Sequence, residues 1–282
     1  MQVVSTIAEL RTRLADKRAI AFVPTMGNLH AGHLDLVRLA RESVARGHGG
    51  CVVASIFVNP LQFGPNEDFD KYPRTLDADC ARLEGSVDVV FAPSINEMYP
   101  AQQTVFVELP TIANEMEGAT RPGHFRGMAT VVLKLLNIVQ PQVAVFGKKD
   151  YQQLHIIRQM VAQLNLPIRI VGGETVRAAD GLALSSRNQY LSQAERGEAI
   201  FLYQTLQGMR LAILQGERDI ERLQQQAVEA LVARGWRAEY VAVRNQSDLQ
   251  AASQSQRDLV ILAAASLGNT RLLDNIEVCL AD

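Results

Sequence analysis

Cysteine is scarce in this chain, which contains only Cys51, Cys80 and Cys279. An odd number of cysteines without a Cys-x-x-Cys pair speaks against a disulfide framework and against a zinc knuckle. Cys51 and Cys279 lie in apolar runs, where free cysteines are usually buried. We therefore predict buried, reduced thiols.

An excess of charge of one sign is also absent, because 28 basic side chains face 30 acidic ones and the formal net charge is -2. Such a balance gives no electrostatic footprint for nucleic acid or for an anionic membrane. No apolar stretch approaches the length that spans a bilayer. The first 18 residues have no apolar core region or small-residue cleavage site, so they indicate a strand and a helix rather than a signal peptide. We expect a cytoplasmic protein that binds neither nucleic acid nor membrane.

What the sequence does have is enough apolar content for a sizeable core, at 48% of 282 residues. Up to about residue 175, strand-like apolar runs alternate with helical patterns, which is typical of a parallel sheet covered on both faces. Strands are predicted at 18–25, 50–58, 87–92, 104–109, 143–146 and 168–171, and helices at 34–40, 75–83, 125–139 and 150–164.

The pattern changes after a loop at 177–188. Two helices are predicted at 193–214 and 219–233, followed by short strands at 239–243, 259–264 and 271–277. Helices followed by clustered strands favour a separate α+β unit. The fold prediction is thus α/β, with a Rossmann-like doubly wound parallel sheet in residues 1–176 and a smaller C-terminal α+β domain in residues 177–282.

The most informative segment is 23–33 (VPTMGNLHAGH), which follows a predicted core strand and opens a helix. Ligands of open α/β sheets bind beyond the carboxyl ends of the strands, and a helix N-terminus there suits phosphates. His30 and His33, three positions apart, would face the same ligand and could hydrogen-bond a triphosphate. Two surface histidines are the plainer alternative. A zinc pair is another, although no Cys or Asp lies at a matching spacing.

A second segment, 55–63 (SIFVNPLQF), ends the next buried strand at the same predicted sheet edge. Asn59 and Gln62 carry neutral amides that can hydrogen-bond a hydroxyl-bearing acid. The alternative is an ordinary turn, because Asn-Pro often opens one.

Three further segments combine turn residues with cations or hydroxyls: 121–127 (RPGHFRG), 146–153 (FGKKDYQQ) and 181–188 (GLALSSRN). Arg121 or Arg126 could hold a carboxylate or a phosphate, the lysine turn could hold phosphates, and the Ser-Ser-Arg run suits β- and γ-phosphates. The corresponding alternatives are a basic helix entry, a solvated lysine pair, and a Ser-rich linker or helix cap.

These five segments, in this order between about residues 22 and 190, resemble the pantothenate synthetase family. The string PTMGNLHAGH is similar to that family's form of the His-x-Gly-His signature of the nucleotidylyltransferase superfamily, which includes class I aminoacyl-tRNA synthetases. The resemblance implies a ligase that uses ATP with Mg²⁺ to turn pantoate into pantoyl-adenylate, and then passes the pantoyl group to β-alanine. It also implies a homodimer and a C-terminal domain that closes over the ATP site.

The resemblance implies roles for individual residues. His33, His30 and Lys149 match catalytic positions, and Gln62, Gln153, Asn59 and Arg121 match the pantoate pocket. The implied ATP contacts are Met26, Gly27, Asn28, Leu29, His30, Ala31, Gly32, His33, Gly147, Lys148, Lys149, Asp150, Val176, Leu184, Ser185, Ser186 and Arg187. Family members commonly have Glu where this chain has Lys148. The Mg²⁺ ligands stay unassigned, with Asp79 and Asp150 as candidates.

Two rival functions remain. An adenylyltransferase acting on a phosphorylated metabolite would share His-x-Gly-His but should lack the Asn-Pro-x-Gln-Phe and Lys-Asp-x-Gln-Gln strings. A nucleotide-binding regulator would bind ATP without completing chemistry. A tRNA synthetase is disfavoured because the chain is short and not basic. Among the other residues, His48 is predicted in a Gly-rich turn, His155 on a helix, and Trp236 and Tyr240 in the core or an interface.

Overall fold

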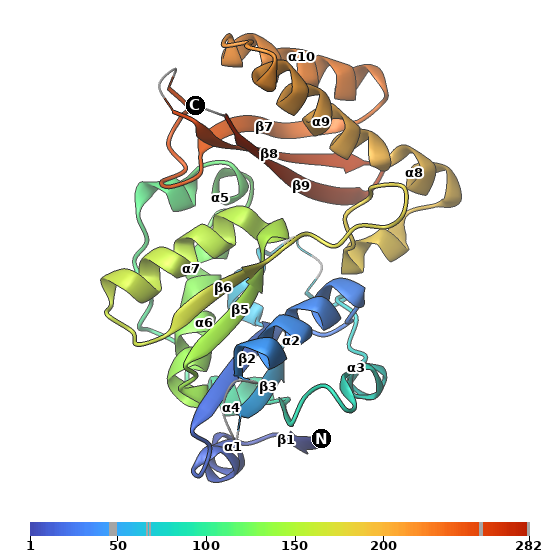
Figure 1. Cartoon of the computed structure of the whole chain (residues 1–282). Helices are drawn as coiled ribbons and strands as arrows, with labels where there is room; N and C mark the ends of the chain where they lie inside the picture. The colour runs from blue at the N-terminus through green and yellow to red at the C-terminus, as the bar shows by residue number, and fades with distance from the viewer. Residues whose placement is uncertain (45–49, 66, 68, 254–255, 281–282) are drawn as a thin grey trace.

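A computed structural model of the chain contains two β-sheets, one formed before residue 174 and one after residue 236 (Figure 1). It describes residues 1–44, 50–65, 67, 69–253 and 256–280. His48 lies outside the described residues. No helix in the described ranges has both the length and the apolar composition needed to span a bilayer.

The larger sheet has six strands in the order β1-β4-β3-β2-β5-β6, and all of its neighbouring strands pair in parallel. The strand order reverses between β2 and β5, which confirms the predicted doubly wound fold and places its switch point there. The strands are β1 (Gln2–Val4), β2 (Ala19–Thr25), β3 (Gly50–Ile56), β4 (Val89–Phe91), β5 (Val143–Gly147) and β6 (Arg169–Gly173).

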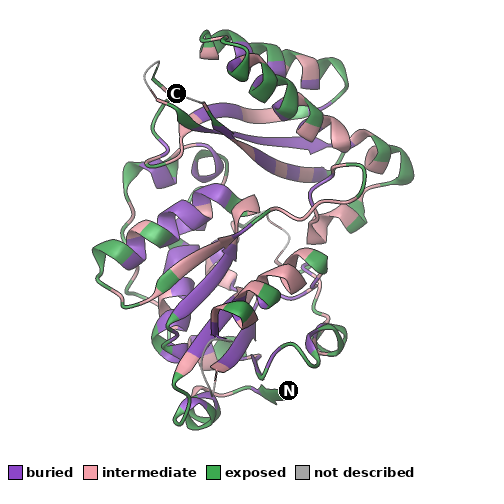
Figure 2. Ribbon diagram, viewed as in Figure 1, coloured by how far each residue is buried: buried purple, intermediate pink, exposed green. Residues whose placement is uncertain are grey.

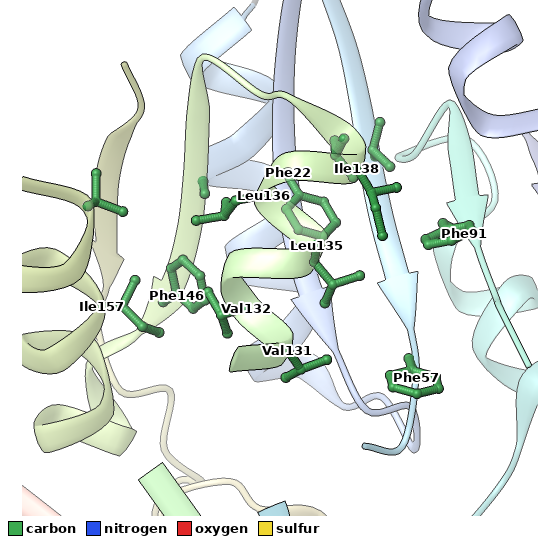
Figure 3. Packing of buried hydrophobic residues seen from close by; sticks show 14 of the residues in the cluster. Phe22, Phe57, Phe91, Val131, Val132, Leu135, Leu136, Ile138, Phe146 and Ile157 are labelled. Carbon is green, nitrogen blue, oxygen red and sulfur yellow. The ribbon is translucent and has the colours of Figure 1, made fainter. Parts of the chain in front are cut away.

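Separate apolar clusters cover the two faces of this sheet, because successive strand residues point to opposite sides. Phe22 packs with α1, α6 and α7, whereas Ala21 and Val23 pack with α2 and α3. Figure 3 shows the first cluster around Phe22, and Figure 2 shows the central strands buried. The helices and 3-10 turns up to this point are α1 (Ile7–Leu14), α2 (Ala31–Val44), η1 (Pro60–Gln62), α3 (Leu76–Leu83), α4 (Ile95–Met98), η2 (Thr111–Asn114), α5 (Glu117–Thr120), α6 (His124–Val139), η3 (Lys148–Asp150) and α7 (Tyr151–Gln163).

Helix boundaries follow local sequence signals. Thr6 caps α1 in a capping box with Glu9, an arrangement that satisfies two free N–H groups. Helix α6 ends where Gln140 adopts a left-handed φ of 51°, just before Pro141, which cannot continue the hydrogen-bonding pattern.

The prediction of a strand at 104–109 is wrong. Val105 is 76% exposed, and the segment joins neither sheet. Instead, the N–H of Val107 donates to Thr130 Oγ1 on α6 (3.3 Å), while Val107 and Leu109 pack onto the core cluster beneath. The apolar alternation therefore reflects packing of a loop on a helix rather than pairing in a sheet.

The C-terminal part contains an antiparallel sheet of order β7-β8-β9 that is covered by α9 and α10. The predicted helix 193–214 is divided at Ala199 into two helices. One sheet face packs under α9 and α10 (Figure 1), with Trp236 in that core. From the other face, Ala242 and Leu262 pack against Tyr151 of the N-terminal part. The elements are η4 (Ser186–Tyr190), α8 (Gln193–Glu198), α9 (Ile200–Leu214), α10 (Ile220–Ala233), β7 (Arg237–Asn245), β8 (Asp258–Leu267) and β9 (Thr270–Cys279).

All three cysteines are free thiols, as predicted. Cys51 is buried in β3, but the expectation of burial is wrong for Cys279, which is exposed at the end of β9.

Candidate active site

A cavity of about 250 Å³ opens at the carboxyl ends of β2 and β5, at the switch point of the parallel sheet. The second predicted segment reaches the same edge, because β3 pairs with β2 in a register that matches Thr25 with Ile56. The predicted residues that line the cavity are Met26, His30, Gly32, His33, Asn59, Gln62, Arg121, Gly147, Lys149, Asp150, Gln153, Val176, Leu184, Ser185, Ser186 and Arg187. The structure therefore brings all five segments to one place.

The turn between β2 and α2 is held from behind by Asp79 of α3, which is only 1% exposed. Its two carboxylate oxygens accept the N–H groups of Asn28 (2.9 Å) and Leu29 (2.7 Å). Gly27 has a φ of 83°, and a Cβ there would lie 3.0 Å from the Asp79 carboxylate, so glycine suits this position for both reasons. Because the carboxylate accepts these backbone groups and does not line the cavity, Asp79 shapes the turn, and its role as a magnesium ligand stays a prediction.

This geometry divides the expected ATP contacts of the turn into residues that line the cavity and residues that do not, and the contacts themselves stay predictions. The side chain of Leu29 is 2% exposed and packs in the core on the α2 side of the sheet. Gly27, Asn28 and Ala31 do not line the cavity either. The turn residues that reach the cavity are Met26, His30, Gly32 and His33.

His30 and His33 lie together in the cavity wall, with ring centroids 4.1 Å apart. His33 Nδ1 accepts the N–H of His30 (3.2 Å), and His30 Nδ1 accepts the N–H of Gly32 (3.2 Å). In a neutral imidazole whose Nδ1 is an acceptor, the proton sits on Nε2. Both rings can thus donate an Nε2–H to a ligand.

The same environment keeps both imidazoles neutral. Burial lowers the pKa of His33 to about 3, and the nearby His30 and Lys149 act in the same direction. The pKa of His30 is lowered to about 4, mainly by burial and to a smaller extent by the positive charges of Lys149 and Arg82. At neutral pH the pair therefore consists of hydrogen-bond donors rather than cations.

The two neighbouring lysines of η3 have different surroundings. Lys149 lines the cavity beside Asp150. Lys148 instead pairs with Glu174 (2.6 Å) and Glu277 (3.0 Å) and does not line the cavity. The side chain of Lys148 is thus held by two carboxylates outside the cavity, and its predicted ATP contact stays a prediction.

The amides of Asn59 and Gln62 are linked to each other. Asn59, which is 1% exposed, donates through Nδ2 to Gln62 Oε1 and to the carbonyl oxygen of Gly127, both at 3.2 Å. Tyr99 donates its hydroxyl to Asn59 Oδ1 (2.8 Å). Asn59 thus braces Gln62, whose Nε2 lies 3.0 Å from the sulfur of Met26 at the cavity.

Arg121 reaches the cavity, but its charge is already balanced. It pairs with Glu67 (2.5 Å) and with the buried Glu117 (3.3 Å). A carboxylate ligand would have to compete with these two partners, so the geometry gives Arg121 a structural role alongside its predicted substrate contact.

The Ser-Ser-Arg loop closes the cavity from the C-terminal side. Ser185 caps η4 by accepting the N–H of Arg187 (3.3 Å). Ser186 donates to the carbonyl oxygen of Asn28 in the histidine turn (3.2 Å). Arg187 and Lys149 also line an adjoining cavity of about 750 Å³ that extends toward Arg271 of β9.

Several cavity residues were not predicted. His124, which is 8% exposed, makes a 2.8 Å hydrogen bond from Nδ1 to the carbonyl oxygen of Gln62, and burial together with Arg121 lowers its pKa to about 4. The main signal in the sequence was the helical periodicity of residues 125–139, which predicted an amphipathic helix but not a ligand. The unpredicted lining residues are Pro24, Thr25, Leu36, Phe57, Phe63, Tyr72, His124, Met128, Val131, Val132, Leu135, Phe146, Glu174, Thr175 and Leu273.

No group of three or more His, Cys, Asp or Glu side chains suited to a metal ion occurs in the described part of the chain. The zinc alternative for His30 and His33 therefore lacks a third ligand among these residues. Asp150 is the Mg²⁺ candidate that does line the cavity.

The fold and the site together define a nucleotide-binding α/β enzyme, with a helix N-terminus, two neutral histidines and a lysine around a cavity at the sheet's switch point. The chain matches the model of the pantoate-beta-alanine ligase family over residues 2–277 and belongs to that family.

Individual relatives agree with this assignment over nearly the whole chain. The chain is 56% identical over 279 residues to a pantothenate synthetase of Nitrosospira multiformis, covering 99% of this chain and 98% of the relative. It is 56% identical over 278 residues to one of Methylobacillus flagellatus, covering 98% of each.

Solved structures agree as well. A pantoate-beta-alanine ligase (pantothenate synthetase) of Thermus thermophilus superposes with a TM-score of 0.93 at 46% identity, covering 99% of this chain and 100% of that one. A pantoate-beta-alanine ligase of Francisella tularensis, solved with beta-gamma ATP and beta-alanine, superposes with a TM-score of 0.81 at 34% identity, covering 98% of this chain and 97% of that one.

Proposed function

We propose that this chain condenses pantoate with β-alanine at the expense of ATP, giving pantothenate, AMP and pyrophosphate. In the first step the pantoate carboxylate attacks the α-phosphorus of ATP, forming pantoyl-adenylate and releasing pyrophosphate. In the second step the amine of β-alanine attacks the activated carbonyl, and AMP leaves. Neither step needs a covalent bond to the protein.

The observation that carries the proposal is the neutral pair His30 and His33, which shares one cavity with the lysine turn and with Gln62. Two Nε2–H donors at the N-terminus of α2 suit the phosphate oxygens on which negative charge grows as pyrophosphate leaves. Because their pKa values are low, both imidazoles are neutral donors at neutral pH. The negative charge of a bound triphosphate then raises their affinity for a proton.

The other cavity residues divide between the two ends of the reactants. Lys149 and Arg187 supply positive charge, and Ser185 and Ser186 supply hydroxyls, for the triphosphate. Gln62 and Gln153 supply amides for the pantoate hydroxyls and carboxylate, against an apolar wall from α6. Asn59 acts by holding Gln62. The protein thus works by positioning and by charge stabilisation.

Mg²⁺ bound with ATP would offset the triphosphate charge. Asp150 fits as its protein contact because it provides a carboxylate at the cavity next to Lys149. The rest of the coordination shell would come from phosphate oxygens and water, since the described residues form no carboxylate cluster there.

The proposal extends to the division of the chain. Residues 1–176 hold the nucleotide and pantoate, and residues 177–282 close over the ATP site. The contact of Ser186 with Asn28 and the presence of Leu273 in the cavity wall support this. By family resemblance we also propose that the protein is cytoplasmic and forms a homodimer. Light scattering of the purified protein would test the dimeric state.

The test is the release of AMP, pyrophosphate and pantothenate from Mg·ATP, pantoate and β-alanine, with each omitted in turn. We expect steady AMP and pantothenate only in the complete mixture, and pantoate-dependent exchange of pyrophosphate into ATP without β-alanine. Tight ATP binding without any product would favour a nucleotide-binding regulator instead. AMP release that ignores pantoate would contradict the substrate assignment.

A further inference from the structure

Asn275 of β9 joins the C-terminal sheet to the lysine turn at the cavity. Asn275 is 7% exposed, and its side-chain Nδ2 donates to the carbonyl oxygens of both Lys148 (3.0 Å) and Lys149 (2.8 Å). One amide group thus satisfies two successive carbonyls of η3, although it belongs to the other part of the fold.

Asn275 is itself held in place by a buried ion pair. Its backbone N–H donates to Asp274 Oδ1 (2.8 Å), and Asp274, which is 4% exposed, accepts two hydrogen bonds from Arg177 (2.6 and 2.8 Å). Arg177 also donates to the carbonyl oxygen of Asn275 (3.3 Å). A bidentate arginine–carboxylate pair fixes orientation strongly, so the amide of Asn275 is preorganised toward the turn.

The ammonium of Lys149 differs from that of Lys148 in its surroundings. Among the residues that the structure describes, no carboxylate forms an ion pair with it, whereas its neighbour Lys148 has two such partners. The direction of the Lys149 side chain therefore follows the backbone of η3. That backbone is fastened to the second sheet by Asn275.

We propose that Asn275 is a positioning residue for the first half-reaction, which sets Lys149 toward the triphosphate and makes that placement depend on the C-terminal part of the chain. The expected effect of Asn275 on the reaction rate rests on the proposed function. Its effect on nucleotide binding can be measured without any turnover.

The variants Asn275→Leu and Asn275→Asp remove both N–H donors, the first without and the second with added charge. Asn245→Asp is the matched control, because Asn245 lies at the end of β7 and donates to Ser247 and Asp248 instead of the turn. In both Asn275 variants we expect the Kd of a non-hydrolysable ATP analogue, measured by calorimetry, to rise about tenfold, as for one or two lost hydrogen bonds.

In pantoate-dependent pyrophosphate exchange, kcat/KM for ATP should fall by about the same tenfold, while KM for pantoate stays unchanged. A general loss of structure would instead lower the active fraction of the protein, reduce its melting temperature and change the kinetic constants for both ATP and pantoate. In a Lys149→Ala background, Asn275→Leu should raise the Kd of the analogue by less than about a further twofold, because the effects of substituting coupled residues on binding free energy are not additive.

Unchanged analogue affinity in both Asn275 variants would overturn the proposal, and so would fully multiplicative effects of the Lys149 and Asn275 substitutions. If the unmodified protein binds the analogue but forms no pantothenate, the proposed function fails, and the affinity series still decides the role of Asn275.

Discussion

Ser186 donates its hydroxyl hydrogen to the carbonyl oxygen of Asn28 across 3.2 Å, although 158 positions separate the two residues along the chain. The contact joins the Ser-Ser-Arg loop directly to the turn that carries His30 and His33. The two sides of the proposed triphosphate site are therefore held against each other by a neutral hydrogen bond.

Replacement of Ser186 by alanine should weaken ATP binding more than pantoate binding. The variant loses both this contact and a hydroxyl at the cavity, so we expect KM for ATP to rise about tenfold. Ser43→Ala is the control, because Ser43 makes a similar bond to the Leu39 carbonyl within α2 (2.8 Å), away from the cavity. Initial rates at varied ATP measure the effect, and equal KM values in the two variants would contradict it.

Replacement of His33 by alanine should abolish most adenylate formation while the protein stays folded. Loss of one preorganised donor to a developing charge costs about 10²–10³ in rate. His155→Gln serves as the control, because His155 is a buried histidine outside the cavity that bonds to Gln159 within α7. Pyrophosphate exchange and thermal melting are the measurements. Normal exchange in a well-folded His33→Ala protein would remove His33 from the mechanism.

Asp79 should matter for both stability and rate, although it does not line the cavity. An Asp79→Asn substitution replaces one acceptor by a donor that faces the N–H groups of Asn28 and Leu29. We expect unfolding free energy to fall by about 1–3 kcal/mol, and the rate to fall because His30 follows that turn. Asp77→Asn, exposed on the same helix, should change neither. Urea unfolding and initial rates would show whether the two variants differ.

Three histidines that line the cavity predict acid sensitivity. Burial lowers the pKa of His30 to about 4, of His33 to about 3 and of His124 to about 4. In the unfolded chain these groups titrate near pH 6.5, so below that pH the unfolded state binds more protons than the folded state. Their contribution to stability is complete above about pH 6.5 and is lost as the pH falls toward 4, by up to about 1.4 kcal/mol per pH unit for each histidine.

Urea unfolding between pH 8 and 5 measures this slope above the range in which most carboxylates titrate. A His124→Gln variant should show a shallower decline, since one of the three groups is removed. A stability profile that is flat between pH 6.5 and 5 would show that the histidines are solvated rather than buried.

Two glycine substitutions should act in opposite directions. At Gly127 of α6, an added Cβ would overlap the carbonyl group of Leu61 and lie 2.8 Å from the N of Gln62. Gly127→Ala should therefore cost about 1–3 kcal/mol and raise KM for pantoate by displacing η1. At Gly208 of α9 nothing lies within 4 Å, and alanine should stabilise by up to about 1 kcal/mol. Thermal melting of both variants tests the pair.

The sequence alone determined the layout of the N-terminal sheet and the edge at which the site forms. Apolar runs such as 50–58 are typical of strands buried on both faces, and parallel strands bring their carboxyl ends to one edge. The segments around His30, Gln62 and Lys149 each follow such a strand, so their convergence could be predicted without coordinates.

Only the tertiary structure decided which side chains of those segments reach the cavity. Lys148 and Lys149 are identical neighbours in the sequence, and the position of Glu277 on β9 separates their roles. In the same way Asp79 faces the backbone of the histidine turn instead of the cavity. Local sequence specifies turns and periodicity, but a side chain's partner from a distant element depends on how the elements pack. Asn275 bonds to the lysine turn for the same reason: its partners lie 126 and 127 positions away, beyond the reach of any local pattern.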